Sequence, residues 1–344
     1  MAPKTLEFDL SKAVGYQNHP AKVAYNRRDL LLYALSIGID ADELNYLYEL
    51  DPNFTPFPTY PLVLQLKGNT FDVNSYAAIS ADQGTVPGVP PFDLNRLVHG
   101  EQYLEVLRKL PHEGNFDLKN EVLGVYDKGS GLVIERCLTM VDAKGVEYVK
   151  MITKVFVIGY GGWGGPKGPK SVTRTLPNRA MDAVEVTTTS RNAALLYRLS
   201  GYAHNSLLAS QILIVFCSSH PWPVAYTISP LCSDYNPLHA DPTIAPKIGF
   251  ERAILHGLCS YGTAAHAIVK HLAANDSDRF VSIDARFAKP VYPGDTLETH
   301  MWKVDGAPAG HEHVYFIVKV KERDVVVISN GLVVLRKGDG KSKL

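Results

Sequence analysis

A carboxylate, an amide and an imidazole stand close together in the second half of this 344-residue chain. Asp234, Asn236 and His239 lie within six residues of one another, and Pro237 stiffens the backbone between them. A carboxylate and an imidazole at this spacing can share one water molecule and move two protons, which is general acid–base chemistry. The residues also fit a structural role, because Asp234 and Asn236 could cap a helix with Pro237 at its first position. The residue types alone leave both interpretations open, and His239 could also be a structural histidine.

Two other features suggest chemistry, but neither makes a strong case. His239 and Asp241 could bind a metal ion, but two ligands without a third nearby are too few, so we expect no metal site. The glycine-rich run 159–170 contains a GxGxxG pattern, which in a dinucleotide-binding protein must open a helix. Prolines at 166 and 169 follow the pattern, and they cannot propagate a helix. We therefore predict a linker here and not a phosphate-binding loop.

The composition is that of an ordinary globular protein without charge bias. Hydrophobic residues make up 46% and charged residues 20% of the chain, and the net charge is zero, so a nucleic-acid partner is not expected. The most apolar run, 207–217, is too short to span a membrane, and the N-terminus lacks the apolar core of a signal peptide. The four cysteines are scattered, which indicates reduced thiols and not a disulfide framework.

The last three residues form a recognisable targeting signal. A C-terminal Ser342-Lys343-Leu344 is the address that a peroxisomal import receptor reads. The preceding residues 337–341 are polar and contain glycine, so they should be flexible enough to reach a receptor. We therefore expect the import receptor as a partner and the peroxisome as the location, with a chance tail as the alternative.

Apolar periodicity predicts two similar halves, each with helical segments followed by antiparallel strands. The first half is predicted to contain a helix near 27–38, proline-rich loops around 52–61 and 87–91, and strands at 116–126, 132–141 and 147–158. The second half is predicted to contain helices near 190–199 and 254–272, and strands at 280–287, 296–304, 311–321 and 325–335. Val98-His99-Gly100 also echoes Leu255-His256-Gly257, a weak internal repeat that indicates two copies of one α+β unit.

Residues 202–233 differ in composition from the rest of the chain. These 32 residues contain no Asp, Glu, Lys or Arg, whereas about six would be expected from the chain average. The codons of Gly201-Tyr202-Ala203 and Cys232-Ser233 can contain a splice donor and a splice acceptor, so we favour a retained intron. Splicing would join Gly201 directly to Asp234. The alternative is a genuine surface insertion, which loops tolerate.

Joined in this way, the chain runs from YRLSG at 197–201 into DYNPLHADP at 234–242. That sequence closely resembles the signature of the MaoC-like (R)-specific enoyl-CoA hydratases, including the hydratase region of the peroxisomal multifunctional β-oxidation enzyme. Four further stretches agree with the family: YNRRD at 25–29, LVHGEQYL at 97–104, ILHGLC at 254–259 and ARFAKPVYPG at 285–294. The resemblance extends from about residue 20 to residue 336, apart from the insert.

The resemblance implies a double hotdog, an α+β fold in which each long helix is wrapped by a curved antiparallel sheet. Residues 1–158 then form an N-terminal, non-catalytic hotdog that accommodates the acyl chain, and 159–180 form a linker. Residues 181–336 form the catalytic hotdog with its insert at 202–233, and 337–344 form the tail. The family tendency suggests a homodimer.

The resemblance also assigns roles to the residues of the first motif. Asp234 and His239 become the acid–base pair, and Asn236 positions the water, since an amide both donates and accepts hydrogen bonds. Gly257, near the start of a predicted helix, is expected to present its N–H to the enolate oxygen. Glycine also lets the thioester approach the backbone closely.

Four residues form the expected substrate-binding set. His99 and Gly100 occupy the echo position in the first half, without an acid–base pair of their own. Lys128 and Phe287 match positions that contact CoA or acyl groups in the family, where lysine suits phosphates and an aromatic ring suits apolar packing. The structural alternatives are a solvated turn lysine for Lys128 and a core residue for Phe287.

The resulting prediction is hydration of trans-2-enoyl-CoA to (3R)-3-hydroxyacyl-CoA in fatty-acid β-oxidation, with acyl-CoA as the substrate. No metal or redox cofactor is expected. A hotdog thioesterase and an acyl-CoA-binding protein without turnover are the alternatives. Because the insert adjoins Asp234, we expect the chain as written to be impaired and a chain without residues 202–233 to be active.

Overall fold

The structure is a computed structural model that describes residues 7–69, 86–93, 96–170, 172–201 and 237–338. Ten strands of this part of the chain form one antiparallel sheet, in the order β1-β3-β4-β5-β2-β7-β10-β9-β8-β6. The strands are β1 Gln17–Tyr25, β2 Leu97–Val106, β3 Gly114–Asp127, β4 Gly131–Val141, β5 Glu147–Ile158, β6 Ala183–Thr188, β7 Phe280–Phe287, β8 Thr296–Val304, β9 His311–Val320 and β10 Val325–Arg336.

The helices are mostly short. They are α1 Leu10–Ala13, α2 Arg27–Ser36, α3 Leu44–Leu47, α4 Leu64–Lys67, α6 Ala193–Tyr197 and α7 Gly257–Leu272, with 3-10 turns η1 Tyr60–Val63, η3 Arg198–Ser200, η4 Pro237–His239, η5 Ala245–Ile248 and η6 Ser277–Arg279. Among the residues that the structure describes, no helix is long and apolar enough to cross a membrane.

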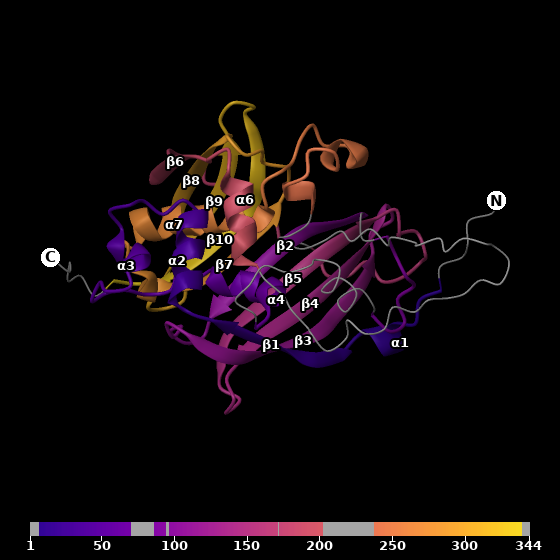
Figure 1. Cartoon of the computed structure of the whole chain (residues 1–344). Coiled ribbons are helices and arrows are strands. Elements are labelled where there is room, and N and C mark those ends of the chain that lie inside the picture. The colour runs from indigo at the N-terminus through magenta and orange to yellow at the C-terminus, as the bar shows by residue number, and fades with distance from the viewer. Residues whose placement is uncertain (1–6, 70–85, 94–95, 171, 202–236, 339–344) are drawn as a thin grey trace, which may run out of the picture.

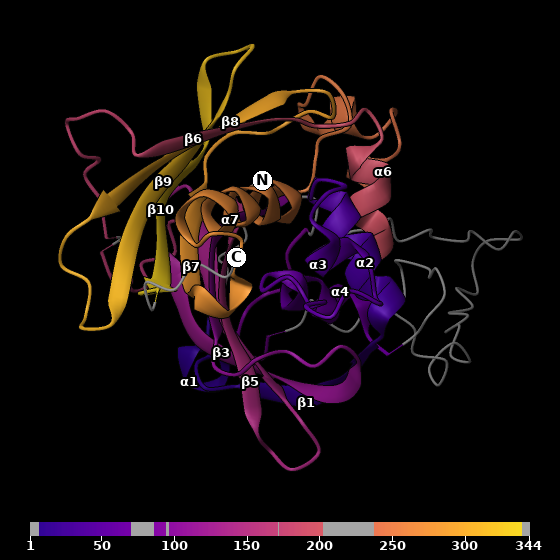
Figure 2. The same ribbon diagram turned by 90° about the vertical axis from the view of Figure 1, so that its left-hand side faces the viewer.

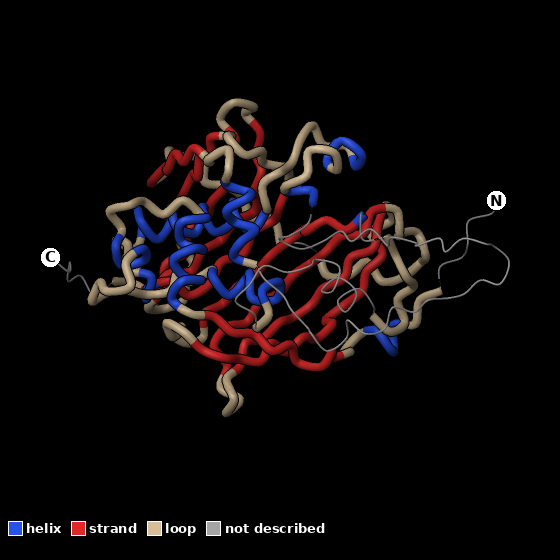
Figure 3. The backbone as a smooth tube through the Cα atoms, in the orientation of Figure 1, coloured by secondary structure: helices blue, strands red, loops and turns tan. Residues whose placement is uncertain are grey.

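The sheet joins the two halves of the chain edge to edge. Strands β1 to β5 come from the first half and β6 to β10 from the second, and the seam is the pairing of β2 with β7 (Figure 1). At this seam Glu101 lies opposite Arg286 and Leu104 lies opposite Ile283. The main group of helices gathers around α7 toward one end of the sheet (Figure 3). Side chains from both halves can therefore meet at the seam.

Helix α7 is the central helix of the second half. Its own residues are small or apolar on nearly all faces, and residues 258–269 are buried. A helix of this composition is stable only when its whole surface is covered. Figure 2 shows α7 in the hollow of the curved strands β6 to β10. The Tyr261 hydroxyl donates to the carbonyl oxygens of Gln102 (3.1 Å) and Ile283 (2.8 Å), which ties the helix to the β2–β7 seam.

The first half differs from the second in its helices. In its described part the longest helix is α2, which packs beside α7: Thr263 Oγ1 donates to the Ile37 carbonyl oxygen at 2.9 Å. The start of α2 explains the YNRRD motif, because Asn26 and Asp29 form a capping box. Asp29 also pairs with the fully buried Lys67, whose Nζ lies 3.4 Å from its carboxylate. This motif therefore has a structural explanation and needs no catalytic one.

The predicted strands agree closely with the observed ones. The predictions 147–158, 280–287 and 296–304 coincide with β5, β7 and β8, and the other predicted strands differ by one or two residues at an end. The predicted helix 254–272 begins three residues late, at Gly257. Strands β1, β2 and β6 were not predicted. The burial of β1 does not alternate over its first six residues, and β2 is interrupted by a bulge.

The two His-Gly pairs resemble each other in sequence but not in structure. His99 and Gly100 lie within strand β2, whereas His256 is the N-cap of α7 and Gly257 its first residue. At Gly100 the pairing of β2 with β5 shifts register, and a Cβ there would lie 3.1 Å from the Lys154 carbonyl oxygen. Gly100 thus meets the steric demand of a β-bulge.

The glycine-rich run has neither helix nor strand, and two of its amides bind a carboxylate of the protein itself. No helix follows it: residues 160–170 have no helix or strand. The carboxylate of Asp127 accepts from the amides of Gly129 (2.7 Å), Gly162 (2.8 Å) and Gly164 (2.8 Å). The amide of Gly162, followed by those of Gly129 and Gly164, lowers the pKa of Asp127 to about 2. The run is thus a nest for the protein's own carboxylate.

Candidate active site

His239 ends the short turn η4 and is held by one strong contact. Its Nδ1 lies 2.8 Å from the carbonyl oxygen of Ile254. Because a carbonyl oxygen only accepts, Nδ1 carries the proton, and the lone pair of the neutral ring is on Nε2. Burial lowers the pKa of His239 to about 4, against the opposing effect of the Ile254 hydrogen bond. His239 is therefore neutral near pH 7, with Nε2 able to take a proton.

His256 packs directly on His239 and was not among the predicted site residues. The two imidazole rings are stacked, with centroids 3.7 Å apart and an interplanar angle of 27°. Only 3% of His256 is exposed, and the Tyr197 ring lies 5.1 Å from the His256 ring, centroid to centroid. The only sequence signal for His256 was its place directly before Gly257 in the ILHGLC motif.

Gly257 is the first residue of α7 and lies on the exposed side of the helix end. The N–H groups of a first helical turn have no acceptor within the helix, and the helix dipole favours negative charge there. A Cβ at Gly257 would lie 3.1 Å from two carbons of the Phe287 ring. Glycine thus keeps the space between the helix terminus and that ring open. Chain continuity with His256 places this terminus next to the His239 ring.

His99 of the first half meets Phe287 of the second half across the seam. Their ring centroids are 4.8 Å apart, with an interplanar angle of 68°. Burial lowers the pKa of His99 to about 4, so this imidazole is also neutral near pH 7. The structure therefore brings together His239, Gly257, Phe287 and His99, through the pairing of β2 with β7 and the packing at the start of α7.

Lys128 is placed apart from this group. It lies in the turn between β3 and β4, where its Nζ donates to the Lys167 carbonyl oxygen and lies 5.8 Å from the centroid of the Tyr126 ring. Both contacts are within the first half and the linker. The predicted role of Lys128 on CoA phosphates stays a prediction.

Several predicted residues lie outside the described part of the chain. These are Asp234 and Asn236, the segment 202–233, and Ser342, Lys343 and Leu344. The described chain before that segment ends with Ser200 and Gly201. Ser200 is buried, and its Oγ lies 3.5 Å from Ser36 Oγ of α2. The catalytic pairing of Asp234 with His239 therefore stays a prediction.

The weak metal interpretation of His239 and Asp241 gains nothing from the structure. The Asp241 carboxylate accepts from the amide (2.8 Å) and hydroxyl (2.7 Å) of Thr243, and His239 Nδ1 is engaged by Ile254. Among the described residues, the acidic side chains close enough to share an ion are Asp40, Asp42 and Glu43. This cluster, in which Glu43 is buried, belongs to the first half and contains neither His239 nor Asp241.

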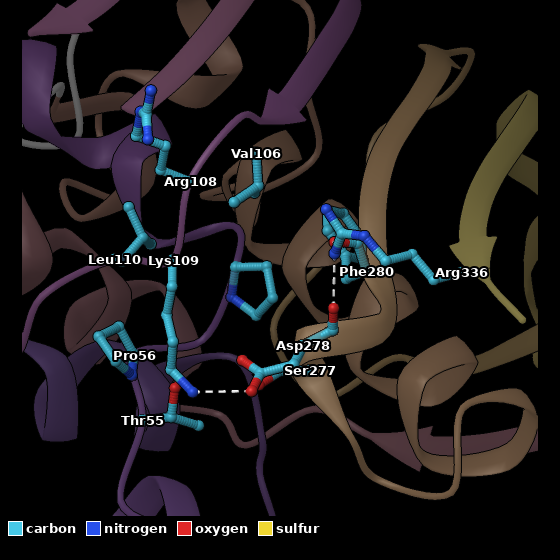
Figure 4. A pocket seen from close by; sticks show the side chains of 11 residues that line it. Thr55, Pro56, Val106, Arg108, Lys109, Leu110, Ser277, Asp278, Phe280 and Arg336 are labelled. Carbon is cyan, nitrogen blue, oxygen red and sulfur yellow. Dashed lines mark hydrogen bonds and ion pairs between the residues drawn. The ribbon is translucent and has the colours of Figure 1, made fainter. Parts of the chain in front are cut away.

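A pocket of about 250 Å³ lies between the halves beyond the other end of α7 (Figure 4). Figure 4 shows Lys109 directed toward Asp278, with Nζ 2.7 Å from the carboxylate, and Arg336 directed toward the Asp278 carbonyl oxygen at 2.6 Å. Gly257 begins α7, which is roughly 24 Å long. The lining residues Ser277 and Asp278 follow the opposite end of that helix. No predicted site residue lines it, and its lining lacks a neutral imidazole. The start of α7 is therefore the candidate active site.

The fold defines a double-hotdog protein, and the group of residues places a neutral imidazole beside a helix terminus. Residues 23–159 match the model of the MFE-2 hydratase 2 N-terminal domain, and residues 230–326 match that of the MaoC like domain. The chain belongs to the MaoC-like enoyl-CoA hydratase 2 family.

Individual relatives cover almost the whole chain. It is 32% identical to a probable enoyl-CoA hydratase 2 of Dictyostelium discoideum, over 95% of this chain and 96% of that protein. It is 34% identical to the peroxisomal multifunctional enzyme type 2 of Mus musculus, over 96% of this chain but only 39% of the mouse protein. A crystal structure of a MaoC-like dehydratase from Phytophthora capsici matches with a TM-score of 0.79 and 33% identity, over 97% of this chain and all of that one. The predicted α+β double hotdog is thereby confirmed.

Proposed function

We propose that this protein is an enoyl-CoA hydratase that converts trans-2-enoyl-CoA into (3R)-3-hydroxyacyl-CoA in fatty-acid β-oxidation. The observation that carries the proposal is a neutral imidazole, His239, that stacks on His256. The next residue, Gly257, presents the N-terminal amide of α7. A base and an oxyanion donor side by side are what addition of water to an enoyl thioester requires. The relatives' names agree with this assignment.

The proposed reaction adds one water molecule to the substrate as a hydroxyl group at Cβ and a proton at Cα. Asp234 and His239 hold the water, with Asn236 orienting it, and the base removes one proton as the oxygen bonds to Cβ. Electrons of the double bond shift toward the thioester oxygen, and the N–H of Gly257 stabilises the charge that develops there. The proton then passes to Cα, so the water is added completely and the enzyme returns to its starting state. Protein groups supply every step, and no cofactor is included in the proposal.

The substrate contacts of the proposal come from both halves. Phe287 and the adjoining His99 flank the approach to Gly257, while the bulge at Gly100 sets the course of β2 beside them. Lys128 is proposed to bind a CoA phosphate from the β3–β4 turn. We also propose that the protein acts in the peroxisome, supported by the peroxisomal name of the mouse relative and by the Ser342-Lys343-Leu344 sequence.

One experiment separates this proposal from its alternatives. Loss of enoyl absorbance with crotonyl-CoA is followed together with release of free thiol, in the chain as written and in a chain without residues 202–233. Hydration predicts loss of absorbance without thiol release, whereas a thioesterase releases CoA. Binding of crotonyl-CoA without either signal, in both folded forms, would replace the proposal with an acyl-CoA-binding protein.

The two forms also test the prediction about the insert. We expect the shortened chain to be the more active one, because a shift of about 1 Å in a catalytic group can cost about a hundredfold in rate. The matched control is His239→Gln in the shortened form, which keeps the side-chain size but removes the base. Equal activity of the two forms would show that residues 202–233 are a tolerated loop.

A further inference from the structure

Nε2 of His99 lies beside the proposed site and makes no hydrogen bond of normal geometry to the described residues. This nitrogen is shielded from solvent. A buried polar atom without a partner costs stability, so it needs an explanation. A group of the bound substrate that completes the hydrogen bond would provide one.

The surroundings of His99 place this nitrogen near the reacting thioester. The Phe287 ring contacts the His99 ring, at 4.8 Å between centroids. It also borders Gly257, where a Cβ would lie 3.1 Å from it. His99 is therefore one aromatic ring away from the amide that is proposed to hold the thioester oxygen. A substrate group that reaches His99 must lie close to the thioester in the substrate.

The chemistry of the substrate narrows the choice of group. An unbranched enoyl chain has no polar atoms beyond the carbonyl, and that oxygen is assigned to Gly257. The nearest remaining polar group is the first amide of the pantetheine arm, two methylenes beyond the sulfur. A neutral imidazole can hydrogen-bond to a neutral amide, whereas a phosphate binds a cationic partner more strongly.

We propose that His99 hydrogen-bonds through Nε2 to the first pantetheine amide of the thioester substrate. This assignment rests on the proposed function and extends it, because it names the substrate group that His99 of the first half would bind in the site of the second. In this proposal His99 recognises the pantetheine arm and not the acyl chain.

Saturated thioesters test the contact without turnover. The probes are butyryl-N-acetylcysteamine, which contains that amide, and S-pentyl thiobutyrate, which has a similar length but no amide. Dissociation constants are measured by NMR titration with the full chain, with His99→Phe, and with the control His300→Phe. His300 is a strand histidine of β8 that is paired with Glu298 at 3.3 Å, outside the group of site residues.

The expected result is a preference that depends on one side chain. The unaltered chain and His300→Phe should bind the amide thioester about fivefold to tenfold more tightly than the amide-free one. In His99→Phe this ratio should fall toward one, while the melting temperature stays the same or rises because an unpaired buried nitrogen is removed.

Three outcomes would overturn the assignment. They are equal binding of both probes by the unaltered chain, an unchanged ratio in His99→Phe, and an equal loss for both probes together with a lower melting temperature. The last of these would make His99 a structural residue. Hydration of crotonyl-CoA, assayed separately, distinguishes failure of this contact from failure of the proposed function.

Discussion

His239 and His256 stack face to face, with ring centroids 3.7 Å apart and planes inclined by 27°. The hydrogen bond from His239 Nδ1 to the Ile254 carbonyl oxygen fixes one edge of the ring, and the stack fixes its plane. Two restraints of this kind leave the His239 ring little freedom to rotate. A base held in one tautomer and one orientation needs no rearrangement before it takes a proton.

The first prediction concerns His239, the proposed base. His239→Gln should lower kcat by about a hundredfold to ten-thousandfold with a small change in KM, because a general base acts mainly in the transition state. The matched control is His311→Gln, since Nδ1 of His311 also faces a backbone carbonyl oxygen, that of Ala309 at 3.2 Å, but far along the chain in β9. Similar losses in both variants would point to a general effect of histidine removal on the fold.

The second prediction concerns the stack. His256→Ala should lower kcat by about tenfold or more, because it removes the surface that orients His239. His256→Phe should retain most of the activity, since a flat ring can still stack. Steady-state kinetics of the two variants give the comparison. If phenylalanine is as poor as alanine, the imidazole nitrogens of His256 matter and the stacking explanation is wrong.

The third prediction concerns the space around the oxyanion donor. Gly257→Ala should reduce kcat/KM by about tenfold to a hundredfold, because the added Cβ would lie 3.1 Å from the Phe287 ring. Phe287→Leu in the same chain should recover part of the loss by making room for the methyl group. A double-mutant cycle on kcat/KM measures this coupling. Strict additivity of the two substitutions would exclude a steric cause.

The fourth prediction concerns pH and stability. The pKa values of His99 and His239 are lowered to about 4 by burial, from an ordinary 6.5. Between these values the unfolded chain binds more protons than the folded chain, so stability increases with pH. The stability contribution is complete above pH 6.5 and is lost as the pH falls toward 4.

Thermal melts at about pH 5 and about pH 7.5 test this sign. The unaltered chain should melt at a lower temperature at the lower pH, and a chain with both His99→Phe and His239→Gln should show a smaller difference. The carboxylates with lowered pKa, such as Asp127, contribute mainly below pH 4 and do not interfere. An unchanged difference in the double variant would mean that other groups cause the acid sensitivity.

Local pattern was sufficient for most of the regular elements. Strands such as β5 and β7 have alternating or β-branched sequences between turn residues, and both coincide with their predictions. The small, apolar sequence of α7 likewise requires a covered helix. Strand β2 escaped prediction because its bulge at Gly100 interrupts the alternation, and a bulge depends on the neighbouring strand.

The sequence by itself determined most of the elements and the family resemblance. It also identified His239 and Gly257 as candidate site residues, because these lie in short motifs whose spacing is fixed along the chain. Only the tertiary structure decided that His99 meets Phe287 and that His256 stacks on His239. The first contact depends on the pairing of β2 with β7, strands from opposite halves, and the second on how a loop packs against the start of α7. Such contacts form because segments that are distant in sequence bury their side chains against each other. The local sequence pattern of either segment does not predict its partner.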